Sequence, residues 1–98
     1  MTARRSIEVD PYVVEVLLPD LVGHDRRASA YLVYLIVAAS PAGKLAASHG
    51  QLAEKAGLSR RSVQSAVAHL AQRGLLEIAR RGQTEVTEYR ALQPWRRT

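Results

Sequence analysis

Apolar residues recur at intervals of three and four positions in the middle of the chain. The first such stretch spans residues 28–39, and its spacing predicts a helix capped by Asp25 or Ser29. One face of this helix carries Ala28, Tyr31, Leu32, Leu35, Ile36 and Ala39. The other face carries Ala30, Val33, Tyr34 and Val37. Because both faces are apolar, neighbouring elements must cover this helix on two sides.

Two more helices are predicted further along, separated only by Gly57, Leu58 and Ser59. The first follows the capping residue Ser48, and its apolar stripe consists of Leu52, Ala53 and Ala56. The second follows Ser59, and its apolar positions are Val63, Ala66, Val67 and Leu70. Gly57 and Gly74 end the two helices, because glycine accepts the left-handed backbone that follows a last turn. Residues 48–73 therefore have the pattern of a helix-turn-helix.

The pattern of residues 11–18 is ambiguous. Asp10 followed by Pro11 suits the start of a helix, which Pro19 would then stop. Valines at three of the next positions suit a strand equally well, namely Val13, Val14 and Val16. We favour the helix, and we expect residues 7–43 to form the N-terminal helices of the fold.

Two β-like stretches complete the pattern. Residues 75–79 and 85–92 are joined by a polar link that contains Gly82, which is a hairpin signal. Residues 44–47 are expected to be a short extended link, residues 1–6 a flexible arm, and residues 93–98 a basic tail. The chain, residues 1–98, has the length of a single domain. The predicted fold class is mainly α with a small β-hairpin, an α+β arrangement.

Charge is distributed unevenly along the chain. Residues 8–25 hold five acidic residues and no lysine or arginine, whereas residues 26–98 hold twelve basic residues and four acidic ones. The net charge of the whole chain is +5. A basic surface of this kind favours a polyanion as partner, because each neutralised phosphate releases condensed counterions.

Several classes of function find no support in the sequence. The chain has no cysteine, and its histidines, His24, His49 and His69, show no metal-ligand spacing. It contains no local catalytic motif and no glycine-rich phosphate loop. Its longest apolar run, residues 28–39, is about half of what a membrane span needs. We therefore expect a cytoplasmic, nucleoid-associated protein with no enzyme activity, no metal, no cofactor and no membrane contact.

The residues around the predicted turn form a distinctive run. It consists of Leu52-Ala53, Ala56-Gly57-Leu58-Ser59, Arg60, Ser62, Val63, Ala66, Val67, Leu70 and Gly74-Leu75-Leu76. This run resembles the bacterial winged-helix regulators, most closely the GntR-type DNA-binding domain. The resemblance implies a winged helix-turn-helix with an extra N-terminal helix and a wing at residues 75–92. It also implies double-stranded DNA as partner, with residues 60–73 as the recognition helix in the major groove.

The expected DNA contacts gather at the start of this recognition helix. Arg60 or Arg61 can pair with guanine, and Gln64 can pair with adenine. The resemblance implies contacts at Ser59, Arg60, Arg61, Ser62 and Gln64, and at Arg80 and Arg81 in the wing. The family often has arginine where this chain has Gln64, so base preference does not carry over. The full expected set is Ser48, Ser59, Arg60, Arg61, Ser62, Gln64, Ser65, His69, Arg80, Arg81 and Gln83.

The apolar faces near the N-terminus predict a homodimer. The expected interface consists of Val13, Leu17, Tyr34 and Val37, although packing within one chain would cover the same faces. A transcriptional regulator that reads an inverted repeat is the favoured function. Two alternatives stay open from the sequence alone: a plasmid or phage replication or partition factor, and a winged-helix module that binds protein.

Overall fold

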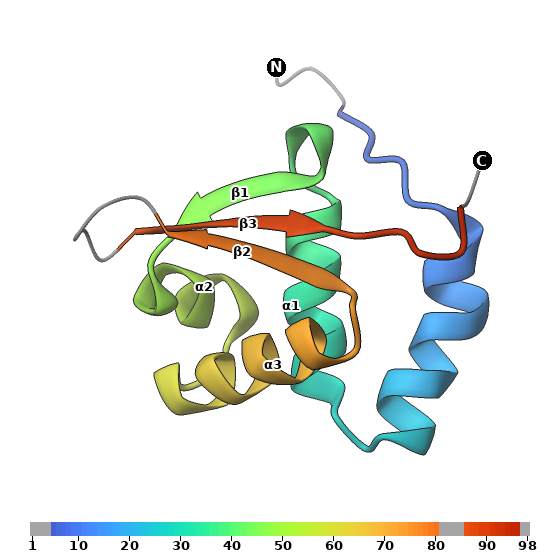
Figure 1. The fold of residues 1–98 in the computed structure, drawn as a ribbon, viewed down its shortest axis with the longest axis horizontal. Coiled ribbons are helices and arrows are strands. Elements are labelled where there is room, and N and C mark those ends of the chain that lie inside the picture. Colours follow the sequence, from blue (N-terminus) through green and yellow to red (C-terminus); the bar gives the residue numbers. More distant parts are fainter. Residues whose placement is uncertain (1–4, 81–85, 97–98) are drawn as a thin grey trace.

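The computed structural model describes residues 5–80 and 86–96 of the chain. Its elements are the π-helical stretches η1 (Val13–Leu17) and η2 (Pro19–His24), α1 (Ala28–Ala38), a short 3-10 turn (Pro41–Gly43), β1 (Lys44–Ala47), α2 (His49–Ala56), α3 (Arg60–Gln72), β2 (Leu76–Arg80) and β3 (Thr87–Ala91). Helices and an antiparallel sheet pack together as an α+β winged helix-turn-helix (Figure 1), as the sequence predicted.

Residues 11–24, called the N-terminal segment below, are helical rather than extended. Asp10 caps the segment, since its Oδ1 accepts a hydrogen bond from the Tyr12 N–H at 2.9 Å. The prediction that Pro19 stops the helix is wrong. A proline ring clashes with the carbonyl four residues earlier in a regular α-helix. Here the winding widens on either side of Pro19 into hydrogen bonds between residues five apart, which relieves that clash and lets the helix continue.

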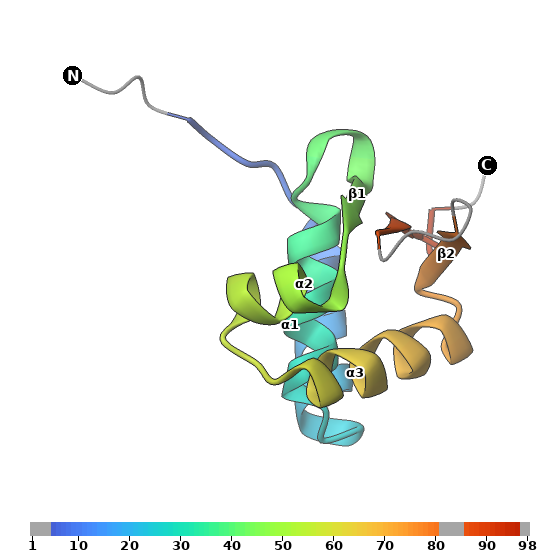
Figure 2. The same ribbon diagram turned by 90° about the vertical axis from the view of Figure 1, so that its left-hand side faces the viewer.

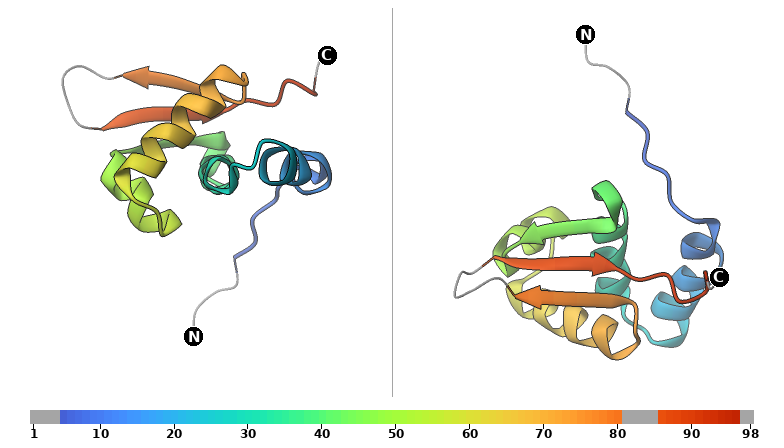
Figure 3. Two further views of the ribbon diagram at one scale, coloured as in Figure 1. Left: turned by 90° about the horizontal axis from the view of Figure 1, so that it is seen from below. Right: turned by 45° about the horizontal axis from the view of Figure 1, so that its top comes forward.

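The inner face of the N-terminal segment packs on α1. Val13, Leu17 and Leu21 lie four residues apart and are at most 3% exposed, and Tyr34 and Val37 of α1 are fully buried. The predicted dimer interface at Val13, Leu17, Tyr34 and Val37 is therefore wrong, because packing within one chain covers these side chains. Figure 3 shows the segment beside α1, on the side away from α2.

Helix α1 begins without the predicted cap. Arg27 stands at the N-cap position and makes no capping hydrogen bond with its side chain. Asp25 is bound to α3 instead, and Ser29 lies within the helix. The far end of α1 is closed by Ser40, whose hydroxyl donates to the Ile36 carbonyl at 2.8 Å.

The sheet has the strand order β1-β3-β2, with both pairs antiparallel. Residues 44–47 are extended as expected, but they also pair with β3, where Leu45 lies opposite Tyr89. Tyr89 occupies the inner face of β3 and is 1% exposed. The three strands lie side by side in the right panel of Figure 3.

Three contacts fasten the part of the chain after β3 to α1 and to the start of the N-terminal segment. The Tyr34 hydroxyl donates to the Leu92 carbonyl at 2.9 Å, and burial raises the pKa of Tyr34 to about 12. The Trp95 ring stacks on Tyr12 with 4.3 Å between ring centroids. Arg96, in the predicted basic tail, pairs with Asp10 at 2.9 Å.

Residues at the start of the chain leave the body of the molecule. Residues 5–8 project away from the helices (Figure 2) and are exposed. The rest of the predicted arm, residues 1–4, lies outside the described residues. Within the described ranges, no helix combines the length and the apolar character needed to cross a membrane.

Candidate nucleic-acid interface

Local hydrogen bonds at the starts of α2 and α3 build the helix-turn-helix, and the sequence predicted both capping serines, Ser48 and Ser59. The Ser48 hydroxyl accepts from the Gln51 N–H at 3.1 Å, and the Gln51 side chain accepts from the Ser48 N–H at 2.9 Å. Gly57 follows α2 with φ of 69°, a left-handed conformation that favours glycine. The Ser59 hydroxyl then accepts from the Ser62 N–H at 3.0 Å and caps α3. Three residues thus suffice to redirect the chain.

Helix α3 has one buried face and one exposed face. Val63, Ala66 and Leu70 are fully buried, and Val67 is 6% exposed. This burial holds the helix against α1 and α2. The opposite side of its first two turns is exposed and carries Arg60, Arg61, Gln64 and Ser65. We call these four residues the reading face.

The reading face is strongly positive. The first turns of α2 and α3 contain no acidic residue. Arg60 and Arg61 form no ion pair with any residue in the described part of the chain. Two arginines at the positive end of a helix dipole repel it, at a cost of about 0.3–1 kcal/mol for each charge. An anionic partner at this end of α3 would remove that cost.

The Arg60 guanidinium lies across the first turn of α2. A cleft of about 190 Å³ opens there, lined by Ser48, His49, Gly50 and Arg60. A Cβ atom added at Gly50 would lie only 2.8 Å from Nη2 of Arg60. Gly50 therefore leaves room for the Arg60 side chain in this position. The sequence analysis placed Gly50 in a helix but did not reveal this role.

The serines of the expected site make contacts within the protein. Ser48 and Ser59 cap helices, and the Ser59 hydroxyl donates to Ser62 Oγ at 3.0 Å. Ser65 accepts a hydrogen bond from Nη1 of Arg27 at 3.0 Å. Arg27 thus joins the reading face from a position 38 residues earlier. Sequence reasoning missed Arg27, because only the packing of the fold brings it beside α3.

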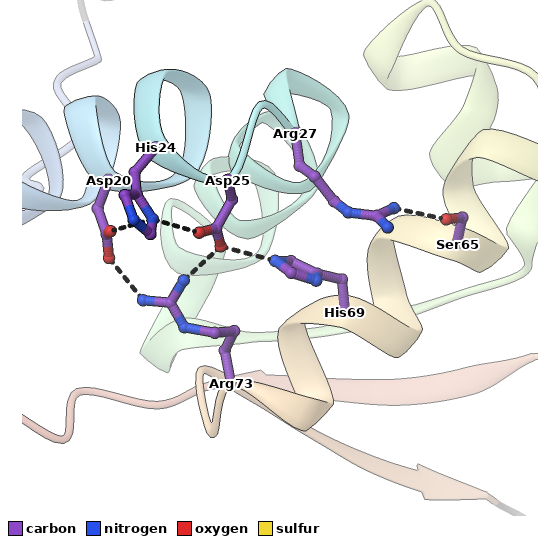
Figure 4. A network of polar contacts seen from close by, with 7 residues as sticks. All are labelled: Asp20, His24, Asp25, Arg27, Ser65, His69 and Arg73. Atoms are coloured by element: carbon purple, nitrogen blue, oxygen red, sulfur yellow. Dashed lines mark hydrogen bonds and ion pairs between the residues drawn. The ribbon is translucent and has the colours of Figure 1, made fainter.

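His69 lies one turn along α3 from Ser65, and its ring points to Asp25 (Figure 4). Its Nε2 lies 2.8 Å from Oδ2 of Asp25, to which it donates, and Arg73 Nη1 donates to the same oxygen. Arg73 also binds Asp20 at 2.5 Å (Figure 4). The expectation that His69 contacts DNA is corrected, since its ring is held by Asp25. We call Asp20, Asp25, His69 and Arg73 the polar clamp, because they tie the N-terminal segment to α3.

The electrostatics of the polar clamp favour the ionised form of Asp25. The hydrogen bond from His69 is the main cause that lowers the pKa of Asp25 to about 2, with a second from His24 at 3.1 Å. Ligand atoms of Asp20, His24 and Asp25 also lie within 4.8 Å of one another, a grouping that a metal ion can use. Since Arg73 binds both carboxylates, the grouping acts as an ion-pair network.

The predicted wing is only partly described. Strands β2 and β3 pair from Leu76 opposite Ala91 to Arg80 opposite Thr87. Arg81 and Gln83, both expected contacts, lie outside the described residues. On the described part of the hairpin, Arg90 pairs with Glu77 at 2.8 Å.

The fold and the reading face together define a helix-turn-helix DNA-binding domain. The chain belongs to the Crp-like helix-turn-helix domain family, which it matches over residues 26–95. This match confirms the winged helix-turn-helix seen in the sequence, and the family is the Crp-like one rather than the GntR type specifically. No match was found among curated proteins or among solved structures.

Proposed function

We propose that the protein regulates transcription by binding a specific double-stranded DNA sequence as a homodimer. The start of α3 lies in the major groove, with Arg61 and Gln64 directed at base edges. The starts of α2 and α3, capped by Ser48 and Ser59, present free backbone N–H groups to phosphates. Wing residues Arg80, Arg81 and Gln83 contact the DNA backbone or the minor groove.

The positive reading face is the observation that carries this proposal. Arg60 and Arg61 are exposed, adjacent to a helix N-terminus and free of acidic partners within the described residues. The buried face of α3 holds them on a rigid element. Arginine pairs with guanine through two hydrogen bonds and also neutralises phosphate, so this face suits both parts of a DNA site.

The test is fluorescence anisotropy of the purified protein with random duplex DNA between 50 and 200 mM salt. We expect affinity to fall steeply with salt, because phosphate contacts release counterions. A specific site selected from a random library should then bind more tightly. On that site, Arg61→Ala should cost about 1–3 kcal/mol of binding free energy if it contacts a base.

Arg90→Ala is the matched control for charge. It removes an arginine that Glu77 already neutralises on the sheet, so DNA affinity should change little. Absence of binding even at low salt, with a folded protein, would contradict the proposal. Equal losses in Arg61→Ala and Arg90→Ala would show that overall charge, rather than the reading face, determines binding.

A further inference from the structure

The outer face of the N-terminal segment carries an apolar row that no described residue of the chain covers. Val14, Leu18 and Val22 lie four residues apart and are 55%, 37% and 36% exposed. The segment therefore has two apolar faces, and packing on α1 buries only the inner one. Contiguous exposed apolar side chains on a helix are typical of an interaction surface.

We propose that this row, Val14, Leu18 and Val22, is covered by a second copy of the chain, with the two N-terminal segments antiparallel about Leu18. The inference rests on the proposed function, which requires two reading helices. In this arrangement Leu18 meets its own counterpart, and Val14 meets Val22 of the other copy. Such a row is self-complementary, as a twofold interface requires.

The charges of the segment favour the antiparallel arrangement. Exposed Glu15 lies in the first half of the segment and exposed Glu8 shortly before it, whereas exposed Arg26 follows its end. Antiparallel segments place opposite charges over one another, and parallel segments would place like charges together. The three remaining carboxylates are paired within the chain, Asp10 with Arg96 and both Asp20 and Asp25 with Arg73, so they do not oppose the approach of a second segment.

The polar clamp connects this interface to DNA reading. Asp20 and Asp25, on and directly after the segment, bind Arg73, and Asp25 also binds His69 (Figure 4). Pairing of two segments therefore fixes how two α3 helices are placed relative to each other. The start of α3 lies on the α2 side of α1, opposite the segment (Figure 3), so pairing leaves both reading faces open.

The first test measures molar mass by sedimentation equilibrium of the full chain without DNA. The wild-type chain should be dimeric, and Leu18→Glu should be monomeric, with an unchanged circular dichroism spectrum. The matched control is Leu32→Glu on α1, where the native leucine is 39% exposed but lies outside the row. It should stay dimeric. A monomeric wild-type chain, or equal behaviour of the two variants, would overturn the proposal.

Binding to random duplex DNA at low salt separates this proposal from the proposed function. The Leu18→Glu monomer keeps its reading face, so it should still bind non-specifically while losing at least tenfold in affinity for an inverted repeat. A dimeric wild-type chain that binds no DNA would contradict the proposed function and leave the interface standing.

Cross-linking tests the antiparallel orientation, and the absence of cysteine from the chain makes single substitutions clean probes. Leu18→Cys should form a disulfide-linked dimer. Val14→Cys alone should not, because two such positions would lie roughly 12 Å apart along antiparallel helices, beyond disulfide reach. Val14→Cys mixed with Val22→Cys should cross-link. Efficient cross-linking of Val14→Cys alone would indicate parallel segments and overturn the proposal.

Discussion

At the residue scale, Gly50 shows how a missing side chain positions a functional one. A methyl group at this position would meet the Arg60 guanidinium, the flexible end of a long side chain that can move away. Gly50→Ala should therefore raise the free energy of unfolding by about 0.5–1 kcal/mol, because alanine favours a helix over glycine. It should also weaken binding to the specific DNA site, because Arg60 is displaced. Urea denaturation and anisotropy measure the two effects.

Gly23→Ala is the control for Gly50→Ala. A Cβ atom at Gly23 would meet no heavy atom within 4 Å. This variant should leave the affinity for DNA unchanged. If Gly50→Ala also leaves affinity unchanged, the position of Arg60 over α2 does not matter for DNA binding.

Asp25 gives the stability of the protein a defined dependence on pH. Its pKa is about 2 in the folded state, lowered from 3.8 chiefly by the hydrogen bond from His69. A carboxylate with a lowered pKa adds stability that is complete above the unfolded pKa and is lost as pH falls through the folded one. Asp25→Asn should therefore lower the urea midpoint clearly at pH 7, and the gap to wild type should narrow from pH 4 towards pH 2.

Exposed Glu15 provides the comparison for Asp25. Its side chain makes no hydrogen bond or ion pair to the rest of the described chain, so Glu15→Gln should change the urea midpoint little at any of these pH values. A gap between Asp25→Asn and wild type that stays constant down to pH 2 would contradict the role assigned to the ionised carboxylate.

The residues whose structural roles could be predicted from the sequence interact with neighbours that are close to them along the chain. Ser48, Gly57 and Ser59 each serve a neighbour within a few positions, so their residue types and spacing reveal their roles. Asp25 and Arg27 were different. Their partners on α3 lie 38 to 48 residues away, and only packing brings them together. Local pattern reasoning therefore placed Asp25 as a cap and left Arg27 out of the site.

At the element scale, the cap of α3 separates stability from DNA binding. Ser59→Ala removes the hydroxyl that accepts from the Ser62 N–H, and it should cost about 1 kcal/mol of stability. Ser59→Asp keeps a capping oxygen, so stability should be retained. It also adds a negative charge beside Arg60 and Arg61, so affinity for DNA should fall. Thermal unfolding and anisotropy distinguish these effects.

Ser59→Asn is the neutral partner of Ser59→Asp. Asparagine caps a helix as well as aspartate does but adds no charge. Both stability and DNA affinity should stay close to wild type. Similar losses of affinity in the Asn and Asp variants would mean that the serine hydroxyl itself contacts DNA.

The N-terminal segment shows why an element can be predicted while its orientation is not. Two rows of apolar residues at a spacing of four run along it, one through Val13 and Leu17 and one through Val14 and Leu18. Either row suits the core, and either suits an interface. The structure buries the first row and exposes the second. Sequence reasoning assigned the interface to the row that the core uses, because side-chain type alone does not distinguish them.

At the scale of the whole molecule, the sheet depends on contacts that are distant in sequence. The hairpin of β2 and β3 could be predicted from its polar link and from the alternation of its residues, whereas β1 joins the sheet by pairing with residues of β3 that lie 40 to 46 positions later. Lys44 to Ala47 alone is too short to show such a partner. The same limit applies to the Tyr34 contact with Leu92, which fixes the end of the chain against α1.

The geometry of a dimer gives the last prediction. In a dimer, a twofold axis relates the two α3 helices. They enter successive major grooves on one side of the duplex, about 10 base pairs apart. Inserting five base pairs between the half-sites rotates one half-site by about half a helical turn, so specific affinity should fall towards the non-specific level. Anisotropy with native and expanded duplexes measures this loss. A monomer that reads each half-site independently would bind both duplexes alike, so equal affinities would contradict dimeric reading.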